Sequence, residues 1–127
     1  MSKRHLFEYA VIRVVPRVER EEFLNVGVVV YCRDLKFLSA LIHVDEKRLN
    51  GFCPSIECEE LKLNLAAYKK ISEGGKNAGP IGLLDSASRF RWLTAQRSTT
   101  VQSSKVHPGM CHDPEKELTK LFEQLVL

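Results

Sequence analysis

Hydrophobic positions dominate two stretches near the start of the chain, and neither stretch has a consistently polar face. Residues 6–15 (LFEYAVIRVV) and 23–32 (FLNVGVVVYC) are rich in β-branched and aromatic side chains and contain no proline, as strands prefer. A strand that is apolar on both faces must be covered on both. We therefore expect two adjacent central strands, with helices on at least one side.

The segment between these strands has the composition of a turn. Pro16 has no N–H to offer a strand ladder, so it ends the first strand. The charged run 17–22 (RVEREE) then connects the two strands as an antiparallel hairpin. Residues 36–44 (KFLSALIHV) alternate as a third strand and extend the hairpin to a meander. The predicted core positions of this third strand are Leu38, Ala40, Ile42 and Val44.

Helical periodicity is present in three later segments. Residues 56–72 carry an apolar stripe at helical spacing. Residues 83–93 form a shorter helix that would bury Leu84 and turn Arg89 toward solvent. Asp113 caps a last helix, in which Pro114 occupies the first position. The predicted stripe of the first of these helices is Cys58, Leu61, Leu65, Tyr68 and Ile71.

The remaining segments are less regular. Asp45 would cap a short helical turn that Asn50-Gly51 ends, and the glycine-rich residues 74–82 form a flexible linking loop. Residues 97–104 (RSTTVQSS) form either a fourth strand at an edge or a loop. Residues 105–112 (KVHPGMCH) are expected to be irregular because of their Pro-Gly pair.

Together these elements predict one α+β domain over residues 1–127. It has an antiparallel sheet of three to four strands, begun by the N-terminal meander and packed with about three helices. No apolar run reaches the about 18 residues of a membrane span. Four cysteines without a secretion signal favour reduced thiols and a cytoplasmic protein. A net charge of +3 permits nucleic-acid binding but does not predict it.

Two runs of the chain also resemble a known family. EYAVIRVVPRVEREEFLNVGVVVYC near the start and SSKVHPGMCHDPEKELTKLFEQLV at the end are similar to the bacterial family called domain of unknown function 3037. The resemblance extends over nearly the whole chain. It implies a small cytoplasmic protein with no established activity and no catalytic residues to transfer. Members are often encoded beside a HipA-type, kinase-like protein, which implies a role in binding that protein partner.

Arg13 is the first candidate for a functional residue, because a guanidinium is costly to bury in an apolar strand without an acidic partner. Glu8, Glu19 and Glu22 of the same hairpin are the candidate partners. Arg13 is either a structural ion pair or snorkelling side chain, or an arginine held to grip a carboxylate or phosphate.

The second strand contributes Asn25 and Gly27, residue types that strands normally lack. Gly27 predicts a bulge or a close backbone approach, for example with a helix packed tightly over it. Asn25 is expected on the same face of the strand as Gly27, where its side chain either contacts a ligand or a partner's backbone or caps a local turn. In the turn, Glu19, Arg20 and Glu22 are either a solvated loop or a contact surface at one end of the sheet.

Basic and hydroxyl side chains are interleaved over residues 89–107. Arg97, Ser103 and Ser104 could bind a phosphate or a nucleic-acid backbone, although no glycine-rich loop opens onto a helix there. An exposed edge strand explains the same residues.

His107 and Cys111 are the candidates for catalysis, since Cys111 lies two residues before a helix N-terminus, which can lower a thiol pKa. Alternatively, His107 and Cys111 could bind zinc together with Cys53, Cys58 and His112. Small apolar cysteines in a reduced cytosol explain them equally, and we predict no metal and no cofactor.

Three functions remain open at this point. The first is a non-enzymatic interaction module that docks through a sheet edge or the charged hairpin. The second is a small hydrolase or nucleotide-handling enzyme with its residues around one cleft, and the third is nucleic-acid binding through the arginines around Trp92. Convergence on one pocket would favour a ligand site, and scatter over separate surfaces would favour a scaffold. The residues to compare are Arg13, Asn25, Arg97 and His107.

Overall fold

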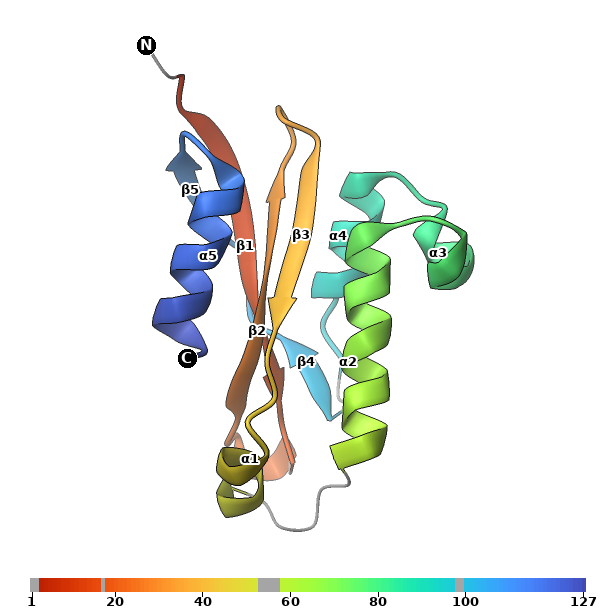
Figure 1. Cartoon of the computed structure of the whole chain (residues 1–127), viewed down its shortest axis with the longest axis vertical. Helices are drawn as coiled ribbons and strands as arrows, with labels where there is room; N and C mark the ends of the chain where they lie inside the picture. Colours follow the sequence, from red (N-terminus) through yellow and green to blue (C-terminus); the bar gives the residue numbers. More distant parts are fainter. Residues whose placement is uncertain (1–2, 17, 53–57, 98–99) are drawn as a thin grey trace.

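The computed structural model describes residues 3–16, 18–52, 58–97 and 100–127. In these ranges the chain forms one antiparallel sheet with helices on both faces (Figure 1). The strands are β1 (His5–Val14), β2 (Leu24–Cys32), β3 (Phe37–Ile42), β4 (Val101–Ser103) and β5 (His107–Cys111). The helices are α1 (Glu46–Phe52), α2 (Cys58–Glu73), α3 (Gly79–Gly82), α4 (Ser86–Thr94) and α5 (Pro114–Leu125), with 3-10 turns η1 (Val18–Arg20) and η2 (Lys76–Ala78).

The sheet is built around β1. One side of β1 pairs with β2, while β4 and β5 share its other side end to end. β3 pairs with the far side of β2, so the strand order is β3-β2-β1-β4, with β5 also on β1. The predicted α+β class and N-terminal meander are confirmed. Across the described residues the sheet has five strands rather than three to four, and there are five helices rather than about three.

The additional strand is β5, so the expectation of an irregular segment at residues 105–112 is wrong there. Pro108 lies opposite Glu8, at a position where the backbone groups of β5 face the outer edge of the sheet. A proline is tolerated there because the ladder does not need its missing N–H. Gly109 lies opposite Phe7, and a Cβ at Gly109 would come within 2.7 Å of the Phe7 ring. The Pro-Gly pair therefore suits an edge strand.

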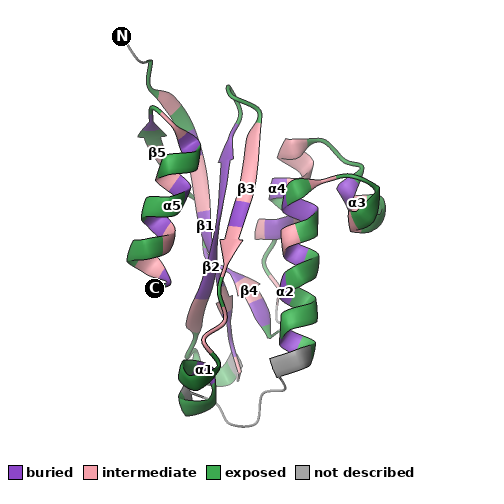
Figure 2. Cartoon of the chain, viewed as in Figure 1, coloured by how far each residue is buried: buried purple, intermediate pink, exposed green. Residues whose placement is uncertain are grey.

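Both faces of the central hairpin are covered, as predicted. α2 and α4 pack on one face and α5 on the other (Figure 1). Figure 2 shows β2 buried over most of its length. The core under α2 and α4 includes Ala10, Ile12, Val14, Val29, Tyr31, Leu65 and Phe90, and the core under α5 includes Phe7, Val28, Val30, Cys32, Leu118 and Leu121.

A β-bulge reverses the alternation of β2 near its start. Ile12 pairs with Gly27 and Arg13 pairs with Asn25, which leaves Val26 as the extra residue. Val26 and Val29 consequently lie in the same core although they are three positions apart. Asn25 therefore points toward α5 and Gly27 toward the opposite face, so the expectation that they share a face is wrong.

Ser104 joins the two strands on the outer side of β1. Its N–H donates to the carbonyl of Val11 at 2.8 Å, and its hydroxyl accepts the N–H of Val11 at 2.8 Å. The ladder of β1 thus continues across the gap between β4 and β5 without an unpaired backbone group at Val11. Of the two alternatives left open for residues 97–104, an edge strand or a loop, the structure has the strand β4 at residues 101–103, and residues 98–99 lie outside the described ranges.

Most helix positions follow the sequence pattern. Asp113 accepts hydrogen bonds from the backbone N–H groups of Glu115 and Lys116, and Pro114 opens α5 as predicted. The predicted stripe of α2 is buried, except that the side chain of Cys58 is outside what the structure describes. No helix in the described ranges combines the length and apolar character needed to cross a bilayer.

Three local predictions differ from the structure. Asp85 caps α4, so Leu84 stays outside that helix and is 45% exposed instead of buried. α1, capped by Asp45 as expected, continues through Asn50-Gly51. The glycine-rich residues 74–82 contain η2 and α3 rather than an irregular loop.

Gly27→Ala is expected to destabilise the fold. A Cβ at Gly27 would lie 2.9 Å from the carbonyl oxygen of Leu41 and 3.0 Å from Cγ1 of Ile42, so β2 and β3 would have to separate. We expect a loss of about 1–3 kcal/mol in the free energy of unfolding, measured in urea. Gly51→Ala is the control: its Cβ would meet nothing within 4 Å, and alanine should stabilise α1 by about 0.5–1 kcal/mol. Equal effects of the two substitutions would contradict this.

Ser104→Ala should remove the acceptor of the buried Val11 N–H. Leaving that donor unpaired is expected to lower the free energy of unfolding by about 1–3 kcal/mol in the same urea experiment. Ser103→Ala is the matched control, because the Ser103 hydroxyl donates only to the adjacent carbonyl of Ser104. We expect Ser103→Ala to lower the free energy of unfolding less than Ser104→Ala does. Equal losses would contradict the role assigned to the Ser104–Val11 hydrogen bonds.

Candidate functional site

The charged turn of the hairpin is exposed. Arg20 and Glu22 form an ion pair at 2.6 Å, with more than half of the Arg20 side chain in solvent. Glu19 is exposed in η1. A surface pair of this kind contributes little to stability, so these residues are free to meet another molecule.

Arg13 lies between Asn25 of β2 and Gln102 of β4 in the sheet register. Its guanidinium Cζ is 4.1 Å from the centroid of the Phe23 ring. The buried Nε has no hydrogen-bond partner among the described residues, and burial lowers the pKa of the guanidinium. Within the described residues Arg13 forms no ion pair, so it is paired with none of its candidate partners Glu8, Glu19 and Glu22.

Asn25 and Gly27 have structural roles. Nδ2 of Asn25 donates to the carbonyl of Leu125 at 3.0 Å and ties β2 to the end of α5. Oδ1 of Asn25 is buried, and no described residue forms a hydrogen bond with it. At Gly27 the bulge and the close approach are both present, but the neighbour is strand β3 and not a helix.

The basic residues between positions 89 and 97 bind their own chain. Arg97 donates to the Tyr68 hydroxyl at 3.0 Å and to the Trp92 carbonyl at 2.6 Å, and it stacks on the Trp92 ring at 4.2 Å. Arg89, expected in solvent, instead donates to the carbonyls of Ile71 and Ser72 at 2.9 Å and thereby caps the end of α2. Of the three arginines flanking Trp92, Arg91 is the one that is exposed.

His107 and Cys111 do not meet. They are four residues apart on β5, which is about 13 Å in a strand. His107 is exposed and its ring lies 5.2 Å from that of Tyr9, whereas Cys111 is buried. Desolvation raises the pKa of the Cys111 thiol, the opposite of an activated nucleophile.

A zinc site is not supported by the residues that can be examined. No cluster of three or more metal-binding side chains occurs in the described ranges, and Cys53 and the side chain of Cys58 lie outside them. The candidates for a shared cleft are likewise distributed over separate surfaces. Arg13 is near the hairpin turn, His107 lies opposite Tyr9 beside the middle of β1, and Arg97 contacts α2 and α4 on the opposite face of the sheet.

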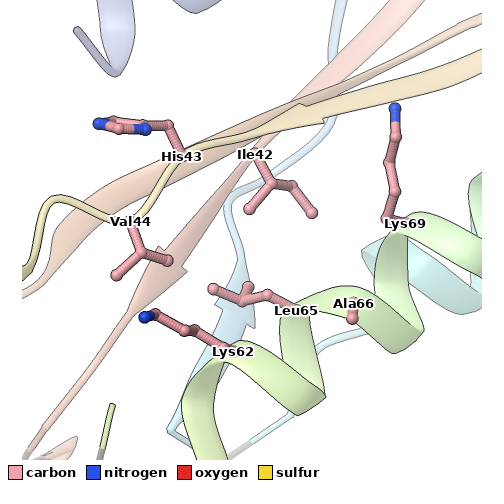
Figure 3. A pocket seen from close by; sticks show the side chains of 7 residues that line it. All are labelled: Ile42, His43, Val44, Lys62, Leu65, Ala66 and Lys69. Carbon is pink, nitrogen blue, oxygen red and sulfur yellow. The ribbon is translucent and has the colours of Figure 1, made fainter. Parts of the chain in front are cut away.

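A groove lies between the last strand of the meander and α2. It has a volume of about 280 Å³, and the sequence did not point to it. Figure 3 shows Ile42 and Val44 pointing toward α2, and His43 pointing away. Leu65 and Ala66 of α2 complete the apolar lining, and Lys62 and Lys69 stand at the rim.

The groove runs along an open edge of the sheet. The His43 N–H donates to the carbonyl of Val26 in β2. Because backbone groups alternate in direction along a strand, the N–H and C=O groups of Leu38, Ala40 and Ile42 face away from β2. The Lys69 ammonium donates to the outward carbonyl of Ala40 and is 3.9 Å from Glu73. Inward-reaching lysines of this kind protect sheet edges from unwanted pairing. In the sequence, a lysine such as Lys69 could have indicated the groove only if β3 had already been known to lie at the edge of the sheet.

Comparison with known proteins gives one match. Residues 9–126 match the family described as Protein of unknown function (DUF3037). The chain belongs to this family. Searches of curated proteins and of solved structures each found no match for this DUF3037 protein. Its function must therefore be argued from its own geometry.

Cys111 of this DUF3037 protein should react slowly with alkylating reagents. Because burial raises its thiol pKa, its thiolate fraction at pH 8 is below that of an ordinary cysteine and increases only as the pH rises further. Iodoacetamide labelling of the folded protein, followed by peptide mass spectrometry, should show Cys111 labelled several times more slowly than free cysteine, as expected of a buried thiol. Labelling faster than free cysteine would restore the nucleophile hypothesis, and labelling in urea is the control for reagent access.

Proposed function

We propose that this DUF3037 protein is a non-enzymatic protein-interaction module that binds an extended, acidic segment of a partner along the outer edge of β3. The observation that carries the proposal is the coincidence of an open strand edge with an apolar groove and two rim lysines. An extended peptide can add to such an edge as a further strand, with main-chain hydrogen bonds giving affinity and alternate side chains filling the groove.

The edge supplies the hydrogen bonds. Leu38, Ala40 and Ile42 each direct an N–H and a C=O away from β2, and in the described part of the chain only the Ala40 carbonyl has a partner. Leu38 and Ile42 are half-buried, whereas Ala40 is covered until Lys69 moves. Three residues with outward groups match a short peptide strand. The neighbouring apolar floor would take the peptide side chains that point toward α2.

The rim supplies the charge selection. Lys62 pairs with Glu46, and Lys69 binds the Ala40 carbonyl, so both ammonium groups already have partners from this chain. A bound peptide would displace Lys69 from the carbonyl, and an acidic peptide side chain would give that ammonium a new partner. Acidic segments are therefore favoured over neutral ones, because only an acidic side chain gives the Lys69 ammonium an ion pair in place of its lost hydrogen bond to the Ala40 carbonyl.

The partner implied by the family resemblance is a HipA-type, kinase-like protein. We expect it to present an extended segment with acidic residues at alternate positions. The binding role does not require catalysis by this chain, in keeping with the separate locations of Arg13, Arg97 and His107.

The double variant Lys62→Glu/Lys69→Glu should weaken binding to the purified kinase-like neighbour. Two attractive rim charges become repulsive, and we expect Kd to rise about tenfold or more by titration calorimetry. The control is Lys116→Glu/Lys120→Glu, the same charge change at exposed positions of α5 on the opposite face. Equal weakening by both variants would indicate a general charge effect and would overturn the assignment to this groove.

Hydrogen exchange of the complex tests the strand-addition geometry itself. The outward amides of Leu38 and Ile42 should exchange more slowly when the partner is bound, while the inward amides of Ser39 and Leu41 are already protected by β2. Protection confined to another surface, or no complex at all, would overturn the proposal.

A further inference from the structure

Arg13 is half-buried and forms no ion pair within the described part of the chain. The Phe23 ring covers one of its faces, and the Nε is shielded from water without an acceptor. A buried guanidinium is favourable only when hydrogen bonds and an opposite charge replace its hydration. No carboxylate among the described residues forms an ion pair with Arg13: Glu22 binds Arg20, Glu8 lies on the other face of β1, and Glu21 lines the neighbouring pocket without pairing with it.

A pocket of about 440 Å³ opens beside this guanidinium. Its volume falls in the range of small-molecule sites, about 300–1,000 Å³. Val15, Glu21, Phe23 and Gln102 line it together with Arg13, and 46% of Phe23 is exposed to solvent. Glu21 has a φ of 55°, a left-handed conformation that residues other than glycine rarely adopt and that is concentrated at functional sites.

We propose that this pocket binds a small carboxylate carried on an apolar or aromatic body. The planar fork of the Arg13 guanidinium matches the two oxygens of a carboxylate. The apolar body lies against Phe23 and Val15. The pocket shares no lining residue with the groove at β3, so this site is distinct from that groove and does not depend on it.

The charges around the pocket select a singly charged anion. Arg13 is the cationic member of the lining residues, and Glu21 contributes a carboxylate to the same pocket. Repulsion from Glu21 is about twice as large for a phosphate dianion as for a carboxylate at the same distance. A monoanion attached to an apolar group therefore fits the pocket better than inorganic phosphate.

The full-length protein should be titrated with benzoate, acetate and inorganic phosphate while the Arg13 Nε–Hε signal is followed by NMR. Benzoate should shift this signal saturably, with a Kd of about 1–10 mM, as expected for a ligand of its size. Acetate, which lacks the apolar body, and phosphate, which is repelled by Glu21, should both bind more weakly. Signals of Phe23 should move with the Arg13 signal.

Two variants separate the site from general charge screening. Arg13→Lys keeps the charge but loses the planar fork, and benzoate binding, followed at Phe23, should weaken about tenfold. Arg20→Lys makes the same replacement at the exposed turn and should leave the benzoate Kd unchanged. Glu21→Gln should tighten phosphate binding more than benzoate binding. Circular dichroism establishes that each variant is folded.

Three results would overturn the proposal. The first is the absence of any saturable benzoate shift at Arg13. The second is phosphate binding more tightly than benzoate to the unaltered protein, which would assign the pocket to a different anion. The third is equal weakening by Arg13→Lys and Arg20→Lys, which would show that the effect is unspecific screening.

Discussion

Burial of the β1–β2 hairpin on both faces is the constraint on which the rest of the structure depends. Its central positions, including Ala10, Val14, Val28, Val29 and Val30, are fully buried. A single helical layer could not cover them, so the chain needs α2 and α4 on one face and α5 on the other. With both faces of the sheet covered, its edges and its two ends are where backbone and side-chain groups remain accessible. Both proposed binding sites lie in these places.

The sequence predicts the elements of this architecture well because periodicity reports burial directly. The two-faced apolar strands, the meander, the stripe of α2 and the Asp113-Pro114 start of α5 all follow from residue type and spacing. β5 was missed because Pro-Gly normally indicates a turn, and only the position of Pro108 at an outer edge makes it acceptable in a strand. The α+β class was therefore predictable, while the strand count depended on tertiary context.

The candidate sites were harder to predict, because their chemistry depends on which side chains meet. Arg89 and Arg97 look like free cations in the sequence, yet each binds backbone carbonyls of neighbouring helices. The bulge at Val26 places Asn25 and Gly27 on opposite faces of the sheet, and the local sequence contains no pattern that predicts the bulge at that position. The cost of burying charge predicted an acidic partner for Arg13, and the lack of such a partner among the described residues is visible only in three dimensions.

The placement of the last strands against the first has a consequence for synthesis on the ribosome. β4, β5 and α5 come from residues 101–125, yet they complete the outer side of β1 and cover one whole face of the hairpin. The meander and α2 can assemble as they emerge, whereas Phe7, Val28 and Val30 stay uncovered until the final quarter of the chain has been translated. A nascent chain of this protein thus presents an apolar sheet face for several seconds at ordinary elongation rates, about 5–20 residues per second, which is the interval in which a chaperone would engage it.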